Sequence, residues 1–186
     1  RIGPSPSLET DMTVPAPELR RTWLFGPGAD ASAHDAMLGS GADALIVDLE
    51  DAVAPAAKDA ARDALAAWLQ QQGDTPTTVP LLVRVNAPGT PWHDADCTLA
   101  SHATVAGLMC PKAERPQDLA ALAAALDGRA LVPLIESAEG LDRVRELARA
   151  PGVQRLAFGS IDFQVDLGMN DEEALLPFRL QLVLQS

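Results

Sequence analysis

The sequence predicts an α/β protein, specifically a TIM-type (β/α)8 barrel of which about six β/α units are present. Short, continuously apolar segments bounded by Gly and Pro alternate with helix-like segments, a pattern typical of buried strands in a parallel sheet. Charged side chains follow the ends of these apolar segments, and a barrel carries its chemistry at the C-terminal ends of its strands. A complete barrel has eight units and about 250 residues, whereas this chain has 186.

A doubly wound parallel sheet is the competing architecture. Such a sheet usually carries a Gly-rich phosphate loop with G-x-G-x-x-G spacing after its first strand. The corresponding segment here, residues 26–30, reads Gly-Pro-Gly-Ala-Asp and lacks that spacing. The sequence therefore favours the barrel.

The chain divides into two parts of different composition. Residues 1–20 contain four prolines and no apolar periodicity, which predicts a Pro-rich disordered N-terminal tail. Residues 21–186 are predicted to form the partial barrel as one catalytic domain.

Six strands are expected within residues 21–186. They are residues 22–25, 42–49, 81–86, 105–110, 131–136 and 156–162. Successive strand–helix units give parallel strands with right-handed crossovers. If two units of the barrel are absent, the first and sixth strands are unpaired edges, and this predicts an oligomer.

Helical spacing of apolar residues separates these strands. One helix is expected over residues 57–69 and ends before Gly73, and a second begins at Pro116 and ends before Gly128. A third spans residues 141–148. Acidic residues at 171–173 begin a last helix, which Pro177 restarts or kinks.

Composition excludes several classes of partner. The net charge of -12 and the pI of about 4.5 argue against nucleic acid or an anionic membrane as the main partner. No apolar segment reaches 18 residues, and the N-terminus lacks a signal-peptide core. Two cysteines, Cys97 and Cys110, form no disulfide framework. Cys110 reads as buried filler rather than a nucleophile. A cytoplasmic protein is expected.

Two acidic residues end successive apolar segments, and they are the strongest signal of chemistry. Glu136 closes residues 131–136 and Asp162 closes residues 156–162. A carboxylate at the end of a buried strand costs several kcal/mol in desolvation unless a cation meets it. A metal site of Glu136 and Asp162 is expected, and two independent helix caps are the alternative.

The chemistry of the donors narrows the choice of metal. The three histidines, His34, His93 and His102, have no metal-ligand spacing, so zinc is not expected. An all-oxygen site completed by water and substrate suits Mg²⁺, or alternatively Mn²⁺.

A second group of charged residues follows the second and third strands. Asp48 and Glu50 share one face of a strand, whereas Asp51 is expected to point away or cap the next turn. Arg84 offers a planar fork for a carboxylate or a developing enolate oxygen. Asp48, Glu50 and Arg84 are the candidate catalytic residues. The alternatives are a surface pair for Glu50 and a structural ion pair for Arg84.

Lys112 follows the fourth strand and allows a different mechanism. A lysine at a strand end of a barrel can form a Schiff base with a ketone. The alternative is a solvated lysine or an ion pair with Glu114.

Six short motifs follow one another along the chain: WLFGPG at 23–28, DLED at 48–51, VRVN at 83–86, PKAE at 111–114, PLIE at 133–136 and GSID at 159–162. As an ordered set they resemble the citrate lyase β-subunit-like and malyl-CoA lyase family. This family belongs to the HpcH/HpaI-type metal-dependent 2-oxo-acid aldolases.

The resemblance implies a Mg²⁺-dependent carbon–carbon lyase acting on a β-hydroxyacyl-CoA such as citryl-, malyl- or citramalyl-CoA. Glu136 and Asp162 would hold Mg²⁺. Arg84 and Glu136 would contact the substrate, Arg84 at its carbonyl or carboxylate. Phe25, Pro27 and Gly28 would line the acyl or pantetheine entrance. The resemblance also implies a homo-oligomer, a trimer, in which a neighbouring subunit contributes a catalytic carboxylate from a C-terminal segment. The sequence ends before such a segment.

Two positions depart from the pattern of CoA-binding relatives. Asp30 and Ala36 stand where an Arg and a Lys would meet the nucleotide phosphates. The departure favours a CoA-independent 2-oxo-acid aldolase as the alternative activity. Thioester hydrolysis is a further option within the same family. The alternative from another class is an inactive fragment or a non-catalytic binding protein.

Overall fold

The structure is a computed structural model that describes residue 16, residues 19–73 and residues 76–186. Most of the predicted N-terminal tail, residues 1–15 and 17–18, lies outside the described residues, so that prediction stays untested.

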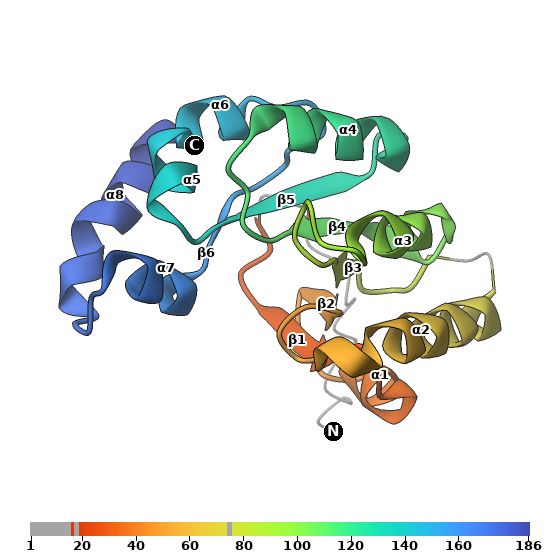
Figure 1. Ribbon diagram of the computed structural model, residues 1–186. Helices are drawn as coiled ribbons and strands as arrows, with labels where there is room; N and C mark the ends of the chain where they lie inside the picture. Colours follow the sequence, from red (N-terminus) through yellow and green to blue (C-terminus); the bar gives the residue numbers. More distant parts are fainter. Residues whose placement is uncertain (1–15, 17–18, 74–75) are drawn as a thin grey trace, which may run out of the picture.

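In the part of the chain that the structure describes, six parallel strands form one curled sheet, and their spatial order follows the chain order (Figure 1). The strands are β1 (Trp23–Pro27), β2 (Ala44–Asp48), β3 (Leu81–Arg84), β4 (Val105–Cys110), β5 (Ala130–Ile135) and β6 (Ala157–Phe158). Neighbouring strands pair in parallel from β1 to β6. A doubly wound sheet would reverse its strand order at a switch point. The strictly sequential order therefore confirms a partial TIM-type barrel.

The helices run in an arc around these strands (Figure 1). The α-helices are α1 (Ala31–Leu38), α2 (Lys58–Gln72), α3 (His93–Cys97), α4 (Pro116–Leu126), α5 (Ala138–Asp142), α6 (Val144–Ala148), α7 (Ser160–Leu167) and α8 (Leu176–Gln185). The structure also contains the short 3-10 segments η2 (Pro55–Ala57), η3 (Thr98–Ser101) and η4 (Glu173–Leu175).

Helix ends agree with the sequence where Gly and Pro mark them. Helix α2 ends at Gly73, whose φ is 74°, and Pro116 begins α4. The predicted helix over residues 141–148 is instead two short helices that break at Arg143. Pro177 lies in the first turn of α8, after η4, and so restarts the helix rather than kinking it. Helices α1, α3 and α7 were not predicted.

Side chains along each strand point alternately to the two faces of the sheet, and apolar side chains pack on both faces. Leu45, Val47 and their equivalents pack outward against the helices, whereas Ile46, Leu82, Met109, Val132 and Leu134 form a separate cluster on the inner face. Because side chains on a strand alternate with a period of two, the next residues on the inner face are polar. These are Asp48 and Glu50 after Ile46, Arg84 after Leu82, and Glu136 after Leu134. The sheet thus directs its charged residues into the mouth of the half-barrel.

The first and sixth strands lie at the two edges of the sheet, as the sequence predicts. Leu24 and Phe25 on β1 are partly exposed. Arg155, just before β6, stacks on the Trp23 ring at 5.4 Å and donates to the Arg20 carbonyl at 2.7 Å. Side-chain contacts therefore connect the two edges where the strands begin. No helix among the described residues is long and apolar enough to cross a membrane.

Candidate active site

A cavity of about 450 Å³ occupies the inside of the half-barrel, and charged residues at the C-terminal ends of the strands contribute to its lining. Its floor is the inner apolar cluster, including Ile46, Met109 and Val132. Its polar lining includes Arg84 on one side and Glu136 and Asp162 on the other. The sequence placed these three residues at one mouth, and the structure brings all three to one cavity.

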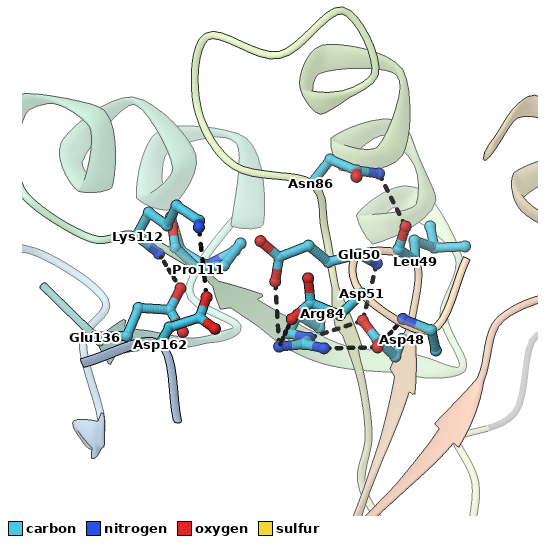
Figure 2. A network of polar contacts seen from close by, with 12 residues as sticks. Asp48, Leu49, Glu50, Asp51, Arg84, Asn86, Pro111, Lys112, Glu136 and Asp162 are labelled. Carbon is cyan, nitrogen blue, oxygen red and sulfur yellow. Dashed lines mark hydrogen bonds and ion pairs between the residues drawn. The ribbon is translucent and has the colours of Figure 1, made fainter. Parts of the chain in front are cut away.

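Arg84 ends β3 and is held mainly by Asp48, which ends β2 (Figure 2). Nε donates to Asp48 Oδ1 at 2.7 Å and Nη2 donates to Oδ2 at 2.6 Å, a bidentate pair. Burial alone would lower the pKa of Arg84, but the hydrogen bonds and charge of Asp48 outweigh burial and raise it. Arg84 is therefore a fixed cation with one face on the cavity.

Asp48 also organises the turn that follows β2. Its carboxylate accepts the backbone N–H of Glu50 at 2.8 Å and that of Ala52 at 3.0 Å. Asp48 does not line the cavity, and its contacts with Arg84 make it the group that orients the guanidinium. The alternative of a structural ion pair for Arg84 is thus realised, together with exposure of Arg84 to the cavity.

Glu50 is buried beside the guanidinium. Its Oε2 lies 3.1 Å from Arg84 Nη1 but without hydrogen-bond alignment, and has no hydrogen-bond partner among the described residues. Burial raises the pKa of Glu50 to about 8, and the charges of Asp51 and Glu136 add to the rise, whereas Arg84 opposes it. Glu50 is therefore mostly protonated at neutral pH. The alternative of a surface Glu50–Lys pair is wrong.

Asp51 differs from its expected position. It lines the cavity with its Oδ2 3.4 Å from Arg84 Nη1, instead of pointing away. Asn86 lies two residues after Arg84 and makes its contacts with neighbouring residues outside the cavity lining. Its Nδ2 donates to the Leu49 carbonyl at 3.1 Å and to Asp96 Oδ2 at 2.6 Å.

Glu136 follows β5 directly and is buried. Its Oε1 accepts the backbone N–H of Lys112 at 2.7 Å. Burial raises the pKa of Glu136 to about 7, and the charge of Asp162 adds to the rise. A Cβ at position 159 would lie 2.6 Å from Glu136 Oε2, so Gly159 leaves the space that this carboxylate occupies.

Asp162 does not end a strand, which corrects the sequence prediction. Strand β6 stops at Phe158, and Asp162 lies in the first turn of α7. The chain turns into the helix because the Phe163 N–H donates back to the Gly159 carbonyl at 3.0 Å. Asp162 still reaches the cavity beside Glu136. Gly159, not Asp162, is the N-cap of α7, so two independent helix caps do not describe this pair.

Lys112 contacts both Glu136 and Asp162, the first through its backbone N–H and the second through its side chain (Figure 2). Its Nζ is 3.4 Å from Asp162 Oδ2, whereas Glu114 accepts a hydrogen bond from Ser137 Oγ at 2.7 Å. The alternative ion pair of Lys112 with Glu114 is therefore wrong. Partial burial alone would lower the pKa of Lys112, but the charge of Asp162 raises it. A protonated amine is no nucleophile, which argues against a Schiff base.

The three entrance residues divide into two groups. Phe25 lines the cavity and stacks on the Arg84 guanidinium at 5.4 Å. Pro27 and Gly28 do not line it. Gly28 N–H donates to the Asp48 carbonyl at 2.8 Å, and a Cβ at position 28 would lie 2.7 Å from that oxygen. Gly28 therefore permits the close approach of β1 to β2, and its expected contact with a substrate is not seen in the cavity lining.

The residues that depart from the CoA pattern lie on α1. Asp30 is the N-cap of this helix, and its Oδ1 accepts the backbone N–H groups of Ser32 at 3.0 Å and Ala33 at 3.2 Å. The hydrogen bond from the Ser32 hydroxyl, with those backbone bonds, lowers the pKa of Asp30. Ala36 is exposed on the same helix.

The donors for a metal are few and all are oxygens. Among the described residues no group of three or more His, Cys, Asp or Glu side chains is placed to hold a metal ion. Glu136 and Asp162 supply two carboxylates, and their mutual repulsion is relieved by a cation. This set fits a hard divalent ion that keeps water and substrate oxygens in its remaining positions. Cys97 and Cys110 contribute nothing here, because burial raises the pKa of both thiols.

Comparison with known proteins identifies close relatives. A family model described as HpcH/HpaI aldolase/citrate lyase matches residues 21–176. The (3S)-malyl-CoA thioesterase of Cereibacter sphaeroides is 34% identical over 153 residues, which cover 80% of this chain and 51% of that protein. The L-malyl-CoA/beta-methylmalyl-CoA lyase of Rhodobacter capsulatus is 35% identical over 179 residues, covering 88% and 55%. The chain spans about half the length of the curated relatives it matches.

Solved structures show the same fold. The citrate lyase beta subunit from Mycobacterium tuberculosis complexed with oxaloacetate and magnesium superposes with a TM-score of 0.70 at 29% identity, covering 91% of this chain and 75% of that one. The CitE protein from the same organism, in complex with magnesium, acetoacetate and coenzyme A, gives 0.72 at 28% identity, covering 90% and 62%.

Proposed function

Since the chain belongs to the HpcH/HpaI aldolase/citrate lyase family, we propose that it carries the active site of a Mg²⁺-dependent carbon–carbon lyase. The substrate class is a β-hydroxyacyl-CoA, such as citryl-, malyl- or citramalyl-CoA, which is cleaved to an acyl-CoA and a 2-oxo acid or formed from them. One observation carries the proposal. A fixed guanidinium and a pair of carboxylates face each other across a single cavity at the C-terminal ends of barrel strands.

Glu136 and Asp162 are the proposed metal ligands. Their oxygen donors, their shared cavity and the space left by Gly159 fit Mg²⁺ and also Mn²⁺. Mg²⁺, when bound there, would polarise the carbonyl oxygen of the 2-oxo acid. The magnesium-bound relatives with oxaloacetate or acetoacetate support this assignment.

Arg84 is the proposed group that stabilises negative charge on the thioester carbonyl of the CoA substrate. In the cleavage direction the β-hydroxyl would give its proton to the carboxylate that the family resemblance assigns to a neighbouring subunit. The carbon–carbon bond breaks, its electron pair moves onto the thioester carbonyl as an enolate, and the enolate carbon then takes up a proton to give the acyl-CoA. Arg84 faces the cavity and would hold that enolate oxygen where the charge develops. Asp48 fixes the direction of the fork through its bidentate pair.

Glu50 has a supporting role in this proposal. Because its carboxyl group is mostly protonated at neutral pH, it does not cancel the positive potential of Arg84. Phe25 covers the guanidinium from the entrance side. The apolar floor, from Ile46 to Val132, limits water near the enolate.

The direct test is product analysis with purified protein. The protein is incubated with Mg²⁺ and each of malyl-, citramalyl- and citryl-CoA, and acyl-CoA products are separated by chromatography. We expect a shorter acyl-CoA and a 2-oxo acid from at least one substrate, and none in EDTA. Release of free CoA without a 2-oxo acid would instead assign thioester hydrolysis. Binding of Mg²⁺ and oxaloacetate without any turnover would assign a non-catalytic binding role.

A CoA-independent 2-oxo-acid aldolase is the second candidate, because of Asp30. Its carboxylate is exposed and its pKa is lowered, so it carries a negative charge on α1. A nucleotide phosphate near this helix would be repelled. Competition decides between the two activities. If CoA itself does not inhibit, and hydroxy acids without CoA are cleaved with Mg²⁺, the aldolase is the function.

Association of subunits belongs to the same proposal. Strands β1 and β6 end the sheet, and each lacks a strand partner on one side among the described residues. We expect a homo-oligomer, with a trimer as the expected form, measured by multi-angle light scattering. A monodisperse monomer with cooperative unfolding would contradict this expectation.

A further inference from the structure

A buried lysine lies beneath the turn that follows β2. Lys58, the first residue of α2, is 6% exposed. Its Nζ donates to the Leu49 carbonyl at 2.8 Å and to the Glu50 carbonyl at 2.6 Å, and lies 5.6 Å from the centre of the Trp92 ring. Among the described residues, no carboxylate lies within ion-pair distance of this ammonium.

This placement is unfavourable for a lysine by two ordinary criteria. A buried ammonium without a paired anion costs several kcal/mol unless hydrogen bonds and polarisable groups replace its water. A cation in the first turn of a helix also opposes the helix dipole. Helix α2 does not use Lys58 as a side-chain cap, since its N-cap position is Ala57 and makes no such bond. The contacts that compensate are therefore those with the turn.

The turn is held from both sides of its backbone. Asp48 accepts the N–H groups of Glu50 and Ala52, whereas Lys58 donates to the carbonyls of Leu49 and Glu50. An anion on the amides and a cation on the carbonyls fix the peptide planes between them. The position of Glu50 beside Arg84 follows from that backbone.

We propose that Lys58 is a positioning residue for the Arg84 side of the active site. It fixes the 49–50 backbone, and through that backbone it keeps Glu50 and Asp48 in place around the guanidinium. The inference rests on the proposed function for its catalytic consequence, but the positioning itself is measurable without turnover.

The first experiment uses chemical labelling to measure how accessible the lysines and Arg84 are. The chain contains two lysines, Lys58 and Lys112. Reductive methylation followed by peptide mass analysis should modify Lys112, whose side chain is 52% exposed, and spare Lys58. Phenylglyoxal modification of Arg84, followed on its own peptide, should be about tenfold faster in Lys58→Met than in the wild type, because a released turn exposes the guanidinium.

A matched control separates positioning from general destabilisation. Arg129 also donates from a cationic side chain to backbone carbonyls, those of Ala100, His102 and Val105, in the segment that leads into β4. Arg129→Met should lower stability and leave the labelling rate of Arg84 unchanged. If Lys58→Met does not fold, Lys58→Gln supplies an uncharged donor in its place and Lys58→Arg retains the charge.

The second experiment separates kinetic parameters. Lys58→Met should lower kcat about tenfold or more, since misplacing a catalytic group by 1 Å can cost about 100-fold. The Kd for Mg²⁺ should change less than about twofold, because Glu136 and Asp162 do not touch the turn. Lys58→Arg should recover part of kcat, as a guanidinium can also donate to two carbonyls.

Distinct results would overturn the inference and the function. Methylation of Lys58 as fast as Lys112 in the folded wild type, or wild-type labelling of Arg84 in both Lys58→Met and Lys58→Gln, would reject positioning by Lys58. A wild-type protein that cleaves no substrate would reject the proposed function while the labelling results still decide the inference.

Discussion

The two sides of the cavity are built differently. On the β2–β3 side, Arg84 and Asp48 have side chains that are 11% and 5% exposed, and they make a bidentate pair. On the β4–β6 side, the Lys112 and Asp162 side chains are 52% and 35% exposed, and they make one contact of 3.4 Å. Strand β6 itself has only two residues.

This comparison shows which charges are balanced by other residues of the same chain. Arg84 meets Asp48 directly, and protonation of Glu50 removes a second negative charge from its surroundings. Asp162 meets the half-exposed ammonium of Lys112, whereas Glu136 meets only the backbone N–H of that residue, so the two carboxylates keep capacity for a cation from solution. The charges on the Arg84 side are therefore balanced within the chain, whereas the carboxylates on the Asp162 side are balanced when a cation binds.

The largest expected effect on activity comes from replacing the guanidinium of Arg84. Arg84→Lys should lower kcat/KM about 100-fold or more, because a point charge cannot hold Asp48 and an enolate oxygen in the same plane. The measurement is steady-state cleavage of the best CoA substrate with saturating Mg²⁺. The matched control is Arg143→Lys, which changes an exposed pair with Glu139. Activity near wild type in Arg84→Lys would remove Arg84 from the mechanism.

The second prediction concerns the side that binding completes. Glu136→Gln and Asp162→Asn should each weaken Mg²⁺ binding about tenfold or more, because a neutral amide replaces one of two anionic ligands. Stability in EDTA should stay equal or rise, since each change removes a repulsion between carboxylates. Calorimetric titration gives the affinity and thermal unfolding gives the stability. Asp142→Asn, at an exposed position on α5, is the control.

The third prediction uses the raised pKa of Glu50. A glutamate in the unfolded chain ionises near pH 4.5, whereas Glu50 in the fold keeps its proton to about pH 8. Between these values the folded state binds more protons than the unfolded state, so stability falls as pH rises. Wild type should therefore lose on the order of 3 kcal/mol of unfolding free energy between pH 5 and pH 8 through Glu50, and Glu50→Gln should not show this loss.

Urea unfolding in EDTA across that pH range measures the slope. Glu136 contributes a smaller slope of the same sign, because its pKa is raised to about 7. The comparison of wild type with Glu50→Gln isolates Glu50. An identical slope in both proteins would show that Glu50 ionises normally.

The sequence predicts the Arg84 side of the cavity better than the Asp162 side, and the reason is periodicity. Ile46, Asp48 and Glu50 alternate along one strand and its extension, so their common face could be read directly. Asp162 was assigned to a strand because residues 156–162 are mostly apolar. The structure begins α7 at Ser160, since hydrogen bonding after Gly159 is helical and no local signal distinguishes the two states.

Tertiary contacts account for what the sequence did not reveal. Lys58 lies at a helix start and looks like a surface residue, and only the packing of α2 under the turn shows its role. Asp51 reaches the cavity because the turn around Asp48 is tight. The barrel and its six strands followed from the order of apolar segments, which depends on local pattern and topology rather than on particular contacts.

The smallest effect is expected at Lys112, whose side chain contacts Asp162. Its raised pKa keeps the amine protonated, so borohydride added during turnover should leave the mass of the protein unchanged. Lys112→Met should change kcat by less than about tenfold, because its half-exposed ion pair with Asp162 is weak. The same variant should bind Mg²⁺ slightly more tightly, since a competing cation is removed from Asp162. A borohydride-trapped adduct on Lys112 would replace the metal route with Schiff-base chemistry and would make this side of the cavity the catalytic one.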